Sequence, residues 1–186
     1  MKKNTQGIFG GMKFSDLAFL GVLIANFMLV GYLGLDDYQR ATKLSQIQTN
    51  GEQIISWFED FSQKLESKEE VTPAACMPLG KEADVTKGAK ANTWNSCIES
   101  LFTGNGPFKA FTNLLMPKDP VYAQKCDKQN LGSSGAFIFE KLIINPVGPP
   151  GVAPMGAGEL IVDDMNIRLS VCDTGYYLIK IGEFKL

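Results

Sequence analysis

Near the N-terminus, one uninterrupted run of apolar residues dominates the pattern of hydrophobic and polar positions. Residues 17–35 read LAFLGVLIANFMLVGYLGL, with no charged side chain and a single amide, Asn26. A helix rises about 1.5 Å per residue, so a helix over this run nearly spans the hydrocarbon core of a bilayer, which is about 30 Å thick. The run therefore predicts a transmembrane helix.

The charges that flank this run predict its orientation. Lys2, Lys3 and Lys13 precede it, and Asp36 and Asp37 follow it. Because positively charged flanks stay in the cytoplasm, we expect the N-terminus inside the cell and the rest of the chain outside the membrane. A cleaved secretory signal peptide is one alternative, but its apolar region is shorter and ends at a small-residue cleavage site. A buried core helix is the other alternative.

Beyond the apolar run, hydrophobic residues recur at spacings of mostly three or four and form one stripe on an otherwise polar helix. The stripe consists of Leu44, Ile47, Ile54, Ile55, Phe58, Phe61 and Leu65. No proline lies between Lys13 and Thr72, so one helix is predicted from about residue 12 to about residue 67. The alternative is a break near residues 31–34. Gly51 lies on the stripe, where it either weakens the helix or lets a neighbouring segment approach closely.

After Pro73 the pattern becomes mixed and then strand-like. A short helix is predicted around residues 94–102, a helical turn over residues 108–115, and a Pro/Gly-rich loop over residues 146–158. Strands are expected at residues 136–144, 159–162, 166–172 and 176–181. These segments predict an antiparallel sheet of roughly three or four strands. The fold class is therefore α+β, with the outer half of the long N-terminal helix packed against one face of a C-terminal sheet.

The composition excludes several classes of function. The chain contains no histidine, the commonest general base and the commonest transition-metal ligand, so Ser-His-Asp and Cys-His catalytic sites are impossible within it. The formal net charge is −2, and no basic cluster occurs beyond the N-terminal end. The sequence therefore predicts no surface that binds nucleic acid. No nucleophile–base pair, phosphate-binding loop or cofactor motif stands out, so we expect neither an enzyme nor a bound cofactor.

The four cysteines, Cys76, Cys97, Cys126 and Cys172, are widely spaced. None belongs to a C-x-x-C pair, which argues against a zinc ribbon or a redox dithiol. Beyond a membrane anchor, such cysteines predict two disulfides in an oxidising compartment, and the alternative is four reduced, buried thiols. Four cysteines allow three connectivities, of which we favour Cys76–Cys97 with Cys126–Cys172 because each bond closes a local loop.

Taken together, the N-terminal features resemble a type IV pilin or pilin-like (pseudopilin) precursor. Such a precursor begins with a short basic leader that ends in glycine, and a prepilin peptidase cuts after that glycine on the cytoplasmic side. Here the leader is residues 1–11, MKKNTQGIFGG, and the cut falls between Gly11 and Met12. The mature chain then begins MKFSD, which places Asp16 at the fifth position, where the family carries an acid. Tyr38 lies where pilins commonly have a tyrosine after the membrane segment.

The resemblance implies four segments: a leader (residues 1–11), a transmembrane and assembly helix (12–35), the amphipathic outer half of that helix (36–72) and a disulfide-bonded α+β head (73–186). It implies a structural subunit of a pilus-like filament used in adhesion, motility, DNA uptake or secretion. The subunit would be held in a bacterial inner membrane with its domain in the periplasm, and would then join further copies or other pilins in an extracellular filament.

The resemblance also implies roles for individual residues. Met12 would be N-methylated, and its amine would pair with Asp16 of a neighbouring subunit, because an acid taken into the bilayer needs a compensating charge. The segment between Cys126 and Cys172 would correspond to the disulfide-bounded C-terminal region of these subunits.

Two other functions fit the same residues. One is an uncleaved single-pass accessory protein of a membrane complex, with its domain outside the membrane. The other is an extracytoplasmic enzyme or sensor domain, whose candidate acids are Asp127, Asp163, Asp164 and Asp173. Such carboxylates could bind calcium, but aspartates at turns more often serve as turn formers, so we expect no metal site and no catalytic residue.

Overall fold

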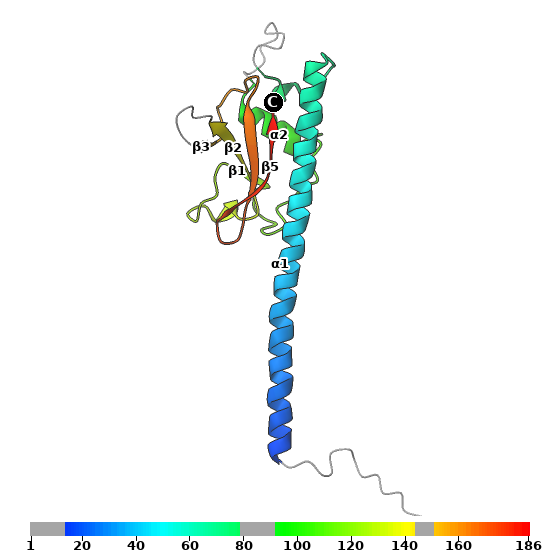
Figure 1. The fold of residues 1–186 in the computed structure, drawn as a ribbon, viewed down its shortest axis with the longest axis vertical. Helices are drawn as coiled ribbons and strands as arrows, with labels where there is room; N and C mark the ends of the chain where they lie inside the picture. The colour runs from blue at the N-terminus through cyan, green and yellow to red at the C-terminus, as the bar shows by residue number, and fades with distance from the viewer. Residues whose placement is uncertain (1–13, 79–91, 144–150) are drawn as a thin grey trace, which may run out of the picture. The chain divides into compact units, whose positions relative to one another are not determined.

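The computed structural model describes the backbone of residues 14–78, 92–143 and 151–186, with their side chains except those of residues 14–16, 36 and 131. The elements in chain order are α1 (Phe14–Glu66), α2 (Trp94–Phe102), β1 (Tyr122–Ala123), β2 (Phe137–Ile143), β3 (Gly151–Pro154), β4 (Asn166–Cys172) and β5 (Leu178–Lys185) (Figure 1). Short 3-10 turns lie at Ala74–Cys76 and Leu131–Ser133. The chain divides into two compact units, here called the N-terminal unit (residues 1–42) and the C-terminal domain (residues 43–186).

The helix α1 is continuous from Phe14 to Glu66, which confirms the prediction of one long helix and excludes a break near residues 31–34. Its two exposed threonines fit the helix because each hydroxyl donates to the carbonyl four residues earlier, Thr42 to Tyr38 at 2.9 Å and Thr49 to Ser45 at 3.1 Å. Lys64 lies in the last turn, where a positive charge is favourable beside the helix dipole.

The sheet of the C-terminal domain has five strands and is mixed, so the prediction of a purely antiparallel sheet with fewer strands is wrong. The order is β1-β2-β4-β5, and β3 also pairs with β2. β1 is parallel to β2, whereas the pairs β2–β3, β2–β4 and β4–β5 are antiparallel. The coarse class, a long helix with a sheet in an α+β fold, agrees with the prediction.

Several element positions differ from the sequence prediction. β3 lies inside the Pro/Gly-rich stretch of residues 146–158, where its short pairing with β2 accommodates Gly151 and Pro154. Residues 159–162 form no strand, and within them Leu160 forms an isolated bridge with Thr93. β5 begins at Leu178 and continues to Lys185, beyond the predicted end. Residues 108–115 contain turns rather than a helix.

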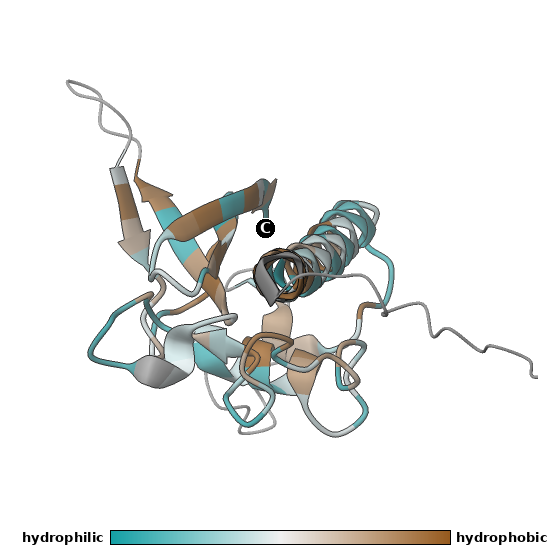
Figure 2. Ribbon diagram, turned by 90° about the horizontal axis from the view of Figure 1, so that it is seen from below, coloured by the Kyte–Doolittle hydropathy of each residue, from teal (hydrophilic) through white to brown (hydrophobic). Residues whose placement is uncertain are grey.

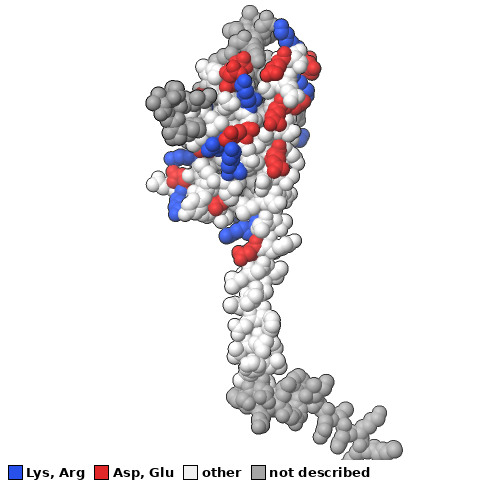
Figure 3. All heavy atoms as spheres, in the orientation of Figure 1, with Lys and Arg blue, Asp and Glu red and all other residues white. Residues whose placement is uncertain are grey.

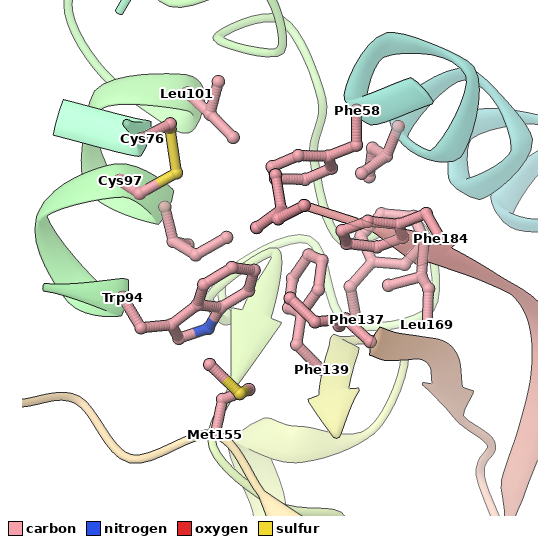
Figure 4. Close-up of a cluster of buried hydrophobic side chains, with 14 of the residues drawn as sticks. Phe58, Cys76, Trp94, Cys97, Leu101, Phe137, Phe139, Met155, Leu169 and Phe184 are labelled. Carbon is pink, nitrogen blue, oxygen red and sulfur yellow. A yellow bond between two sulfur atoms is a disulfide. The ribbon is translucent and has the colours of Figure 1, made fainter. Parts of the chain in front are cut away.

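Within the C-terminal domain, the stripe on α1 packs against the sheet and α2. Ile47, Ile54, Phe58, Phe61 and Leu65 are buried, and Leu44 and Ile55 are half-buried, as predicted. The Phe58 ring stacks on Phe184 of β5, with ring centroids 4.3 Å apart and planes 6° from parallel (Figure 4). Hydrophobic and hydrophilic positions alternate along the strands (Figure 2), so one face of the sheet can join this core.

Gly51 brings α1 close to β5. A Cβ atom at Gly51 would lie 2.5 Å from Cδ1 of Ile181 and 3.2 Å from Cε1 of Phe137. On the strand, a Cβ atom at Gly182 would lie 2.7 Å from Cδ1 of Ile55. Both glycines therefore serve the close approach of helix and strand, which is the second of the two explanations offered for Gly51.

Two disulfides and one helix cap fix the connecting segments. The disulfides join Cys76 to Cys97 and Cys126 to Cys172, which is the favoured connectivity. The first ties a 3-10 turn to α2, and the second ties the segment before Leu131–Ser133 to the end of β4. α2 spans the predicted residues, and the Thr93 hydroxyl caps it by accepting from the Ser96 N–H at 3.3 Å.

Candidate functional site

The residues that the sequence singles out for assembly lie at the start of α1. Gly11 and Met12, the predicted cleavage positions, lie outside the described residues. Asp16 lies in the first turn of α1, and its side chain is outside the described part of the chain. The structure therefore places Asp16 on the helix directly before the apolar run and leaves its predicted partner untested.

The apolar run that follows is exposed along its whole length. From Leu17 to Leu35 its large hydrophobic side chains are between 38% exposed, at Leu23, and 76% exposed, at Tyr32. No charged atoms appear on this stretch in the space-filling view (Figure 3). Among the described helices, α1 is long and apolar enough to cross a membrane. A run of this length that is exposed throughout does not fit a buried core helix.

The single polar side chain of the run is satisfied by the helix itself. The Asn26 amide nitrogen donates to the carbonyl oxygen of Val22 at 2.9 Å, one helical turn earlier. In lipid or against another apolar helix, an unpaired amide donor would cost several kcal/mol, roughly 2–7 depending on the surroundings. This contact therefore lowers the cost of an apolar environment around Asn26.

In the C-terminal domain, the loop beside the Cys126–Cys172 disulfide is organised by Asn113, a residue that the sequence reasoning missed. Asn113 is 1% exposed, and its amide nitrogen donates to the carbonyls of Pro120 at 3.1 Å and Ser134 at 2.7 Å. Its carbonyl oxygen accepts from two backbone N–H groups. Gly135 has φ +77°, and a Cβ atom there would lie 2.1 Å from that oxygen. In the sequence, Asn113 and Gly135 are 22 residues apart and form no motif, so their contact could not be predicted.

A hollow opens in the C-terminal domain beside α2. Its apolar floor is formed by Trp94, Ile98, Phe139 and Met155, with Tyr122 and two amide side chains nearby. Burial raises the pKa of the Tyr122 hydroxyl, and the negative charge of Glu99 adds to that effect. None of the side chains that line this hollow is acidic or basic, so the hollow offers no general acid–base pair at neutral pH.

The four aspartates considered for calcium do not converge. Among the described residues, no group of three or more potential metal-ligating side chains comes together. Asp127 accepts from the Gln129 N–H at 2.9 Å, and Asp173 accepts from the Gly175 and Tyr177 N–H groups at 2.8 and 2.7 Å. Asp164 forms an ion pair with Lys185. Asp127 and Asp173 thus act as turn formers, as the alternative explanation holds.

An ion pair between Lys141 of β2 and Glu159 secures the segment after β3. Glu159 also accepts from the Gly156 N–H at 3.2 Å. Burial alone would raise the pKa of Glu159, but the bonds from Lys141 and Gly156 and the positive charge of Lys141 outweigh it, so this pKa is lowered. A lowered pKa means that the folded state stabilises the ionised carboxylate of Glu159 more than the unfolded state does.

We therefore expect the Glu159→Gln variant to be about 1 kcal/mol less stable than the original chain at pH 7. The contribution of Glu159 is present above the ordinary glutamate pKa of 4.5 and is lost as the pH falls through the lowered value. Denaturant unfolding at a series of pH values would show the two stabilities converging below about pH 4. A difference that stays constant down to pH 3 would contradict this role.

Comparison with known proteins adds no identification. No protein-family model, curated protein or solved structure matches this chain.

Proposed function

We propose that this chain is a structural subunit of a type IV pilus-like filament that assembles through its N-terminal helix. The observation that carries the proposal is the apolar run of residues 17–35, which is uncharged and exposed on every side of α1. In water such a surface is strongly unfavourable, at about 25 cal/mol for each Å² of apolar area. It needs lipid around it in the membrane and neighbouring apolar helices in a polymer.

The proposal places a membrane stage before the filament stage. The N-terminus stays in the cytoplasm, a prepilin peptidase cuts between Gly11 and Met12, and the C-terminal domain lies in the periplasm of a bacterial cell. The two disulfides suit this oxidising location. Subunits then leave the bilayer and exchange lipid for the helices of other copies. Repeated contacts of one head-to-tail kind generate an open helical polymer.

In this proposal Asp16 sets the register of assembly. A carboxylate moved to the centre of a bilayer costs about 2.5–3.5 kcal/mol, and the methylated amine of a neighbouring Met12 would offset that cost. The alternative role is local, because an acid in the first turn of a helix is favourable beside the helix dipole. The two roles differ in whether a second subunit is needed.

Replacing Asp16 with alanine is expected to reduce the number of assembled filaments by at least about tenfold, since an unpaired amine would remain in the apolar bundle. Electron microscopy of cells that express each variant would give the count, with immunoblots of membranes to show that subunit levels are equal. The matched control is Asp16→Glu, which keeps the negative charge and should retain filaments. Normal filament numbers in the alanine variant would remove the assembly role.

The rival function is an uncleaved single-pass accessory protein of a membrane complex. It shares the anchor and the outer domain but keeps residues 1–11. Mass spectrometry of the N-terminal peptide from native membranes separates the two functions. A methylated Met12 supports the filament subunit, whereas an intact Met1 in all of the protein supports the accessory role.

A further inference from the structure

The hollow beside α2 lies where two short strands on the same edge of β2 end. β4 pairs with the other edge, so β1 and β3 share this one. β1 runs parallel to β2 and stops opposite Ile138, whereas β3 runs antiparallel and stops opposite Glu140. The two strands therefore end on either side of Phe139. The residues that follow them, Gln124 and Met155, both line the hollow, which is thus a gap in the sheet edge beside the first turns of α2.

Four polar side chains that line the hollow have no hydrogen-bond partner among the described residues. They are the indole of Trp94, the hydroxyl of Tyr122 and the amides of Asn95 and Gln124. A buried indole N–H or tyrosine hydroxyl usually has a partner, and an amide can both donate and accept. Together these groups offer a ligand several hydrogen bonds that the folded chain does not use itself.

The Trp94 indole is the most deeply placed of the four. Its side chain is part of the core and only 5% exposed, yet its nitrogen donates to no acceptor in the described part of the chain. In Figure 4 this nitrogen lies on the side of the ring toward Met155, which also lines the hollow. Within the same residues, the one fully buried side-chain nitrogen or oxygen without a partner is Oγ of Ser134. The indole N–H is therefore not sealed in the core, and a ligand in the hollow can reach it.

Charge and polarity limit the class of ligand. Where the structure describes the chain, no charged side chain lines the hollow, and two nearby ion pairs, Lys125–Asp127 and Lys141–Glu159, satisfy their own charges. Glu99 acts on the tyrosine hydroxyl but is not part of the lining. A charged ligand would lose its hydration without an opposite charge in contact. A wholly apolar ligand would cover four polar groups without bonding them, which is also unfavourable.

The size of the hollow limits the ligand further. Its volume is about 220 Å³. Sites for drug-sized ligands have roughly 300–1,000 Å³, and a cavity of about 150 Å³ is enough for benzene. The hollow therefore fits one six-membered ring with its substituents. A pyranose sugar is such a ring, with an apolar C–H face and a rim of hydroxyls that donate and accept, and it matches an apolar floor surrounded by neutral polar groups.

We propose that this hollow binds one neutral hexopyranose, with an apolar face of the sugar on the floor and its hydroxyls bonded to Trp94, Asn95 and Gln124. This inference goes beyond the proposed filament, because it gives the C-terminal domain a ligand of its own. It does not depend on assembly, since every group that it uses belongs to one chain.

Titration of the full chain with neutral sugars tests the site. The probes are the methyl glycosides of glucose, galactose, mannose, N-acetylglucosamine and N-acetylgalactosamine, and the chain is kept in a detergent whose headgroup is not a sugar. Saturation-transfer NMR detects binding through the signals of the glycoside. At least one of the five should bind with a Kd of about 1 mM, as expected for so small a ligand. If none approaches saturation at about 50 mM, the proposal is overturned.

Two further probes test the class of ligand. Cyclohexanol is a six-membered ring with a single hydroxyl, and methyl glucosaminide is a sugar with an ammonium group. Each should bind at least about tenfold more weakly than the best neutral glycoside, because one lacks the hydroxyls and the other brings an uncompensated charge. Equal or tighter binding of cyclohexanol would show a merely apolar site, and equal or tighter binding of methyl glucosaminide would show a site for cations. Either result would overturn the proposal.

Substitutions in the lining place the sugar in the hollow. Asn95→Ala and Gln124→Ala change exposed side chains, so the fold should remain intact, and each should weaken binding by about threefold to tenfold. Trp94→Phe keeps an aromatic ring in the core but removes the N–H, and the expected loss is about tenfold. Gln129→Ala, at an exposed amide outside the lining, is the control and should leave the affinity unchanged.

The outcomes are independent of the proposed function, because the titration uses single subunits in detergent and filament counts play no part in it. A glycoside that binds with the same affinity to the original chain and to all three lining variants would bind elsewhere, and the site in the hollow would be wrong. Absence of filaments would overturn the proposed function and leave the sugar site standing.

Discussion

Replacing Phe58 with alanine is expected to destabilise the C-terminal domain by about 3–5 kcal/mol, a large part of the stability of a domain of this size. Phe58 is 0% exposed and lies between the ring of Phe184, 4.3 Å away by centroid, and the ring of Trp94, 6.1 Å away. The substitution removes the ring that joins α1, β5 and α2 (Figure 4). The loss combines apolar transfer, the cavity that remains and two aromatic contacts.

The chain supplies its own probe for this experiment. Its two tryptophans, Trp57 and Trp94, both contact the Phe58 ring, so intrinsic fluorescence reports on the same cluster that the substitution disturbs. Denaturant unfolding of the full chain in detergent gives the free energy of unfolding of each variant. Tyr177→Ala, at a residue 70% exposed, is the control and should change that free energy by less than about 0.5 kcal/mol. A similarly small loss in Phe58→Ala would contradict the packing described here.

The helical parts of the fold could be predicted because their signals are local. The spacing of Ile54, Phe58 and Phe61 identified the buried face of α1 directly, since residues three and four apart share one side of a helix. The end of α2 followed from the glycines after residue 102, whereas its Thr93 cap is seen only in the structure.

The sheet was harder to predict because strand pairing depends on distant residues. β3 is a short strand in a Pro/Gly-rich stretch, and it exists because the backbone of β2 presents a partner, not because its own residues favour a strand. The parallel pairing of Tyr122 and Ala123 with β2 involves only two residues, too few for any periodic signal. Residues 159–162 have a strand-like composition, but the bridge from Leu160 to Thr93 attaches them to the start of α2 instead.

The candidate site divides in the same way. The apolar run and its flanking charges were evident from the sequence, because an uncharged apolar stretch of this length predicts a membrane-spanning helix without further information. The exposure of Tyr177, Leu178 and Ile179 could not be predicted, because these residues have the composition of a buried strand. Leu178 and Ile179 pair with Cys172 and Val171 at the end of β4, and the sequence carries no local signal of that register.

Removing the Cys126–Cys172 disulfide is expected to destabilise the C-terminal domain more than removing Cys76–Cys97. The bonded residues are 46 positions apart in the first case and 21 in the second. A longer closed loop restricts the unfolded chain more, and the loop-entropy relation gives losses of about 4 and about 3 kcal/mol. The free energy of unfolding of a domain is usually about 5–15 kcal/mol, so either loss is a large share of it.

Alanine pairs are the suitable variants for this comparison, because Cys76, Cys97 and Cys172 are 0% exposed and a buried serine hydroxyl would add a cost of its own. Denaturant unfolding with tryptophan fluorescence gives each free energy of unfolding, and adding a reductant to the original chain should lower its stability below that of either variant. If the reductant leaves the unfolding midpoint unchanged, or if the Cys76→Ala/Cys97→Ala chain is the less stable of the two, closure of the longer loop is not the dominant constraint on the domain.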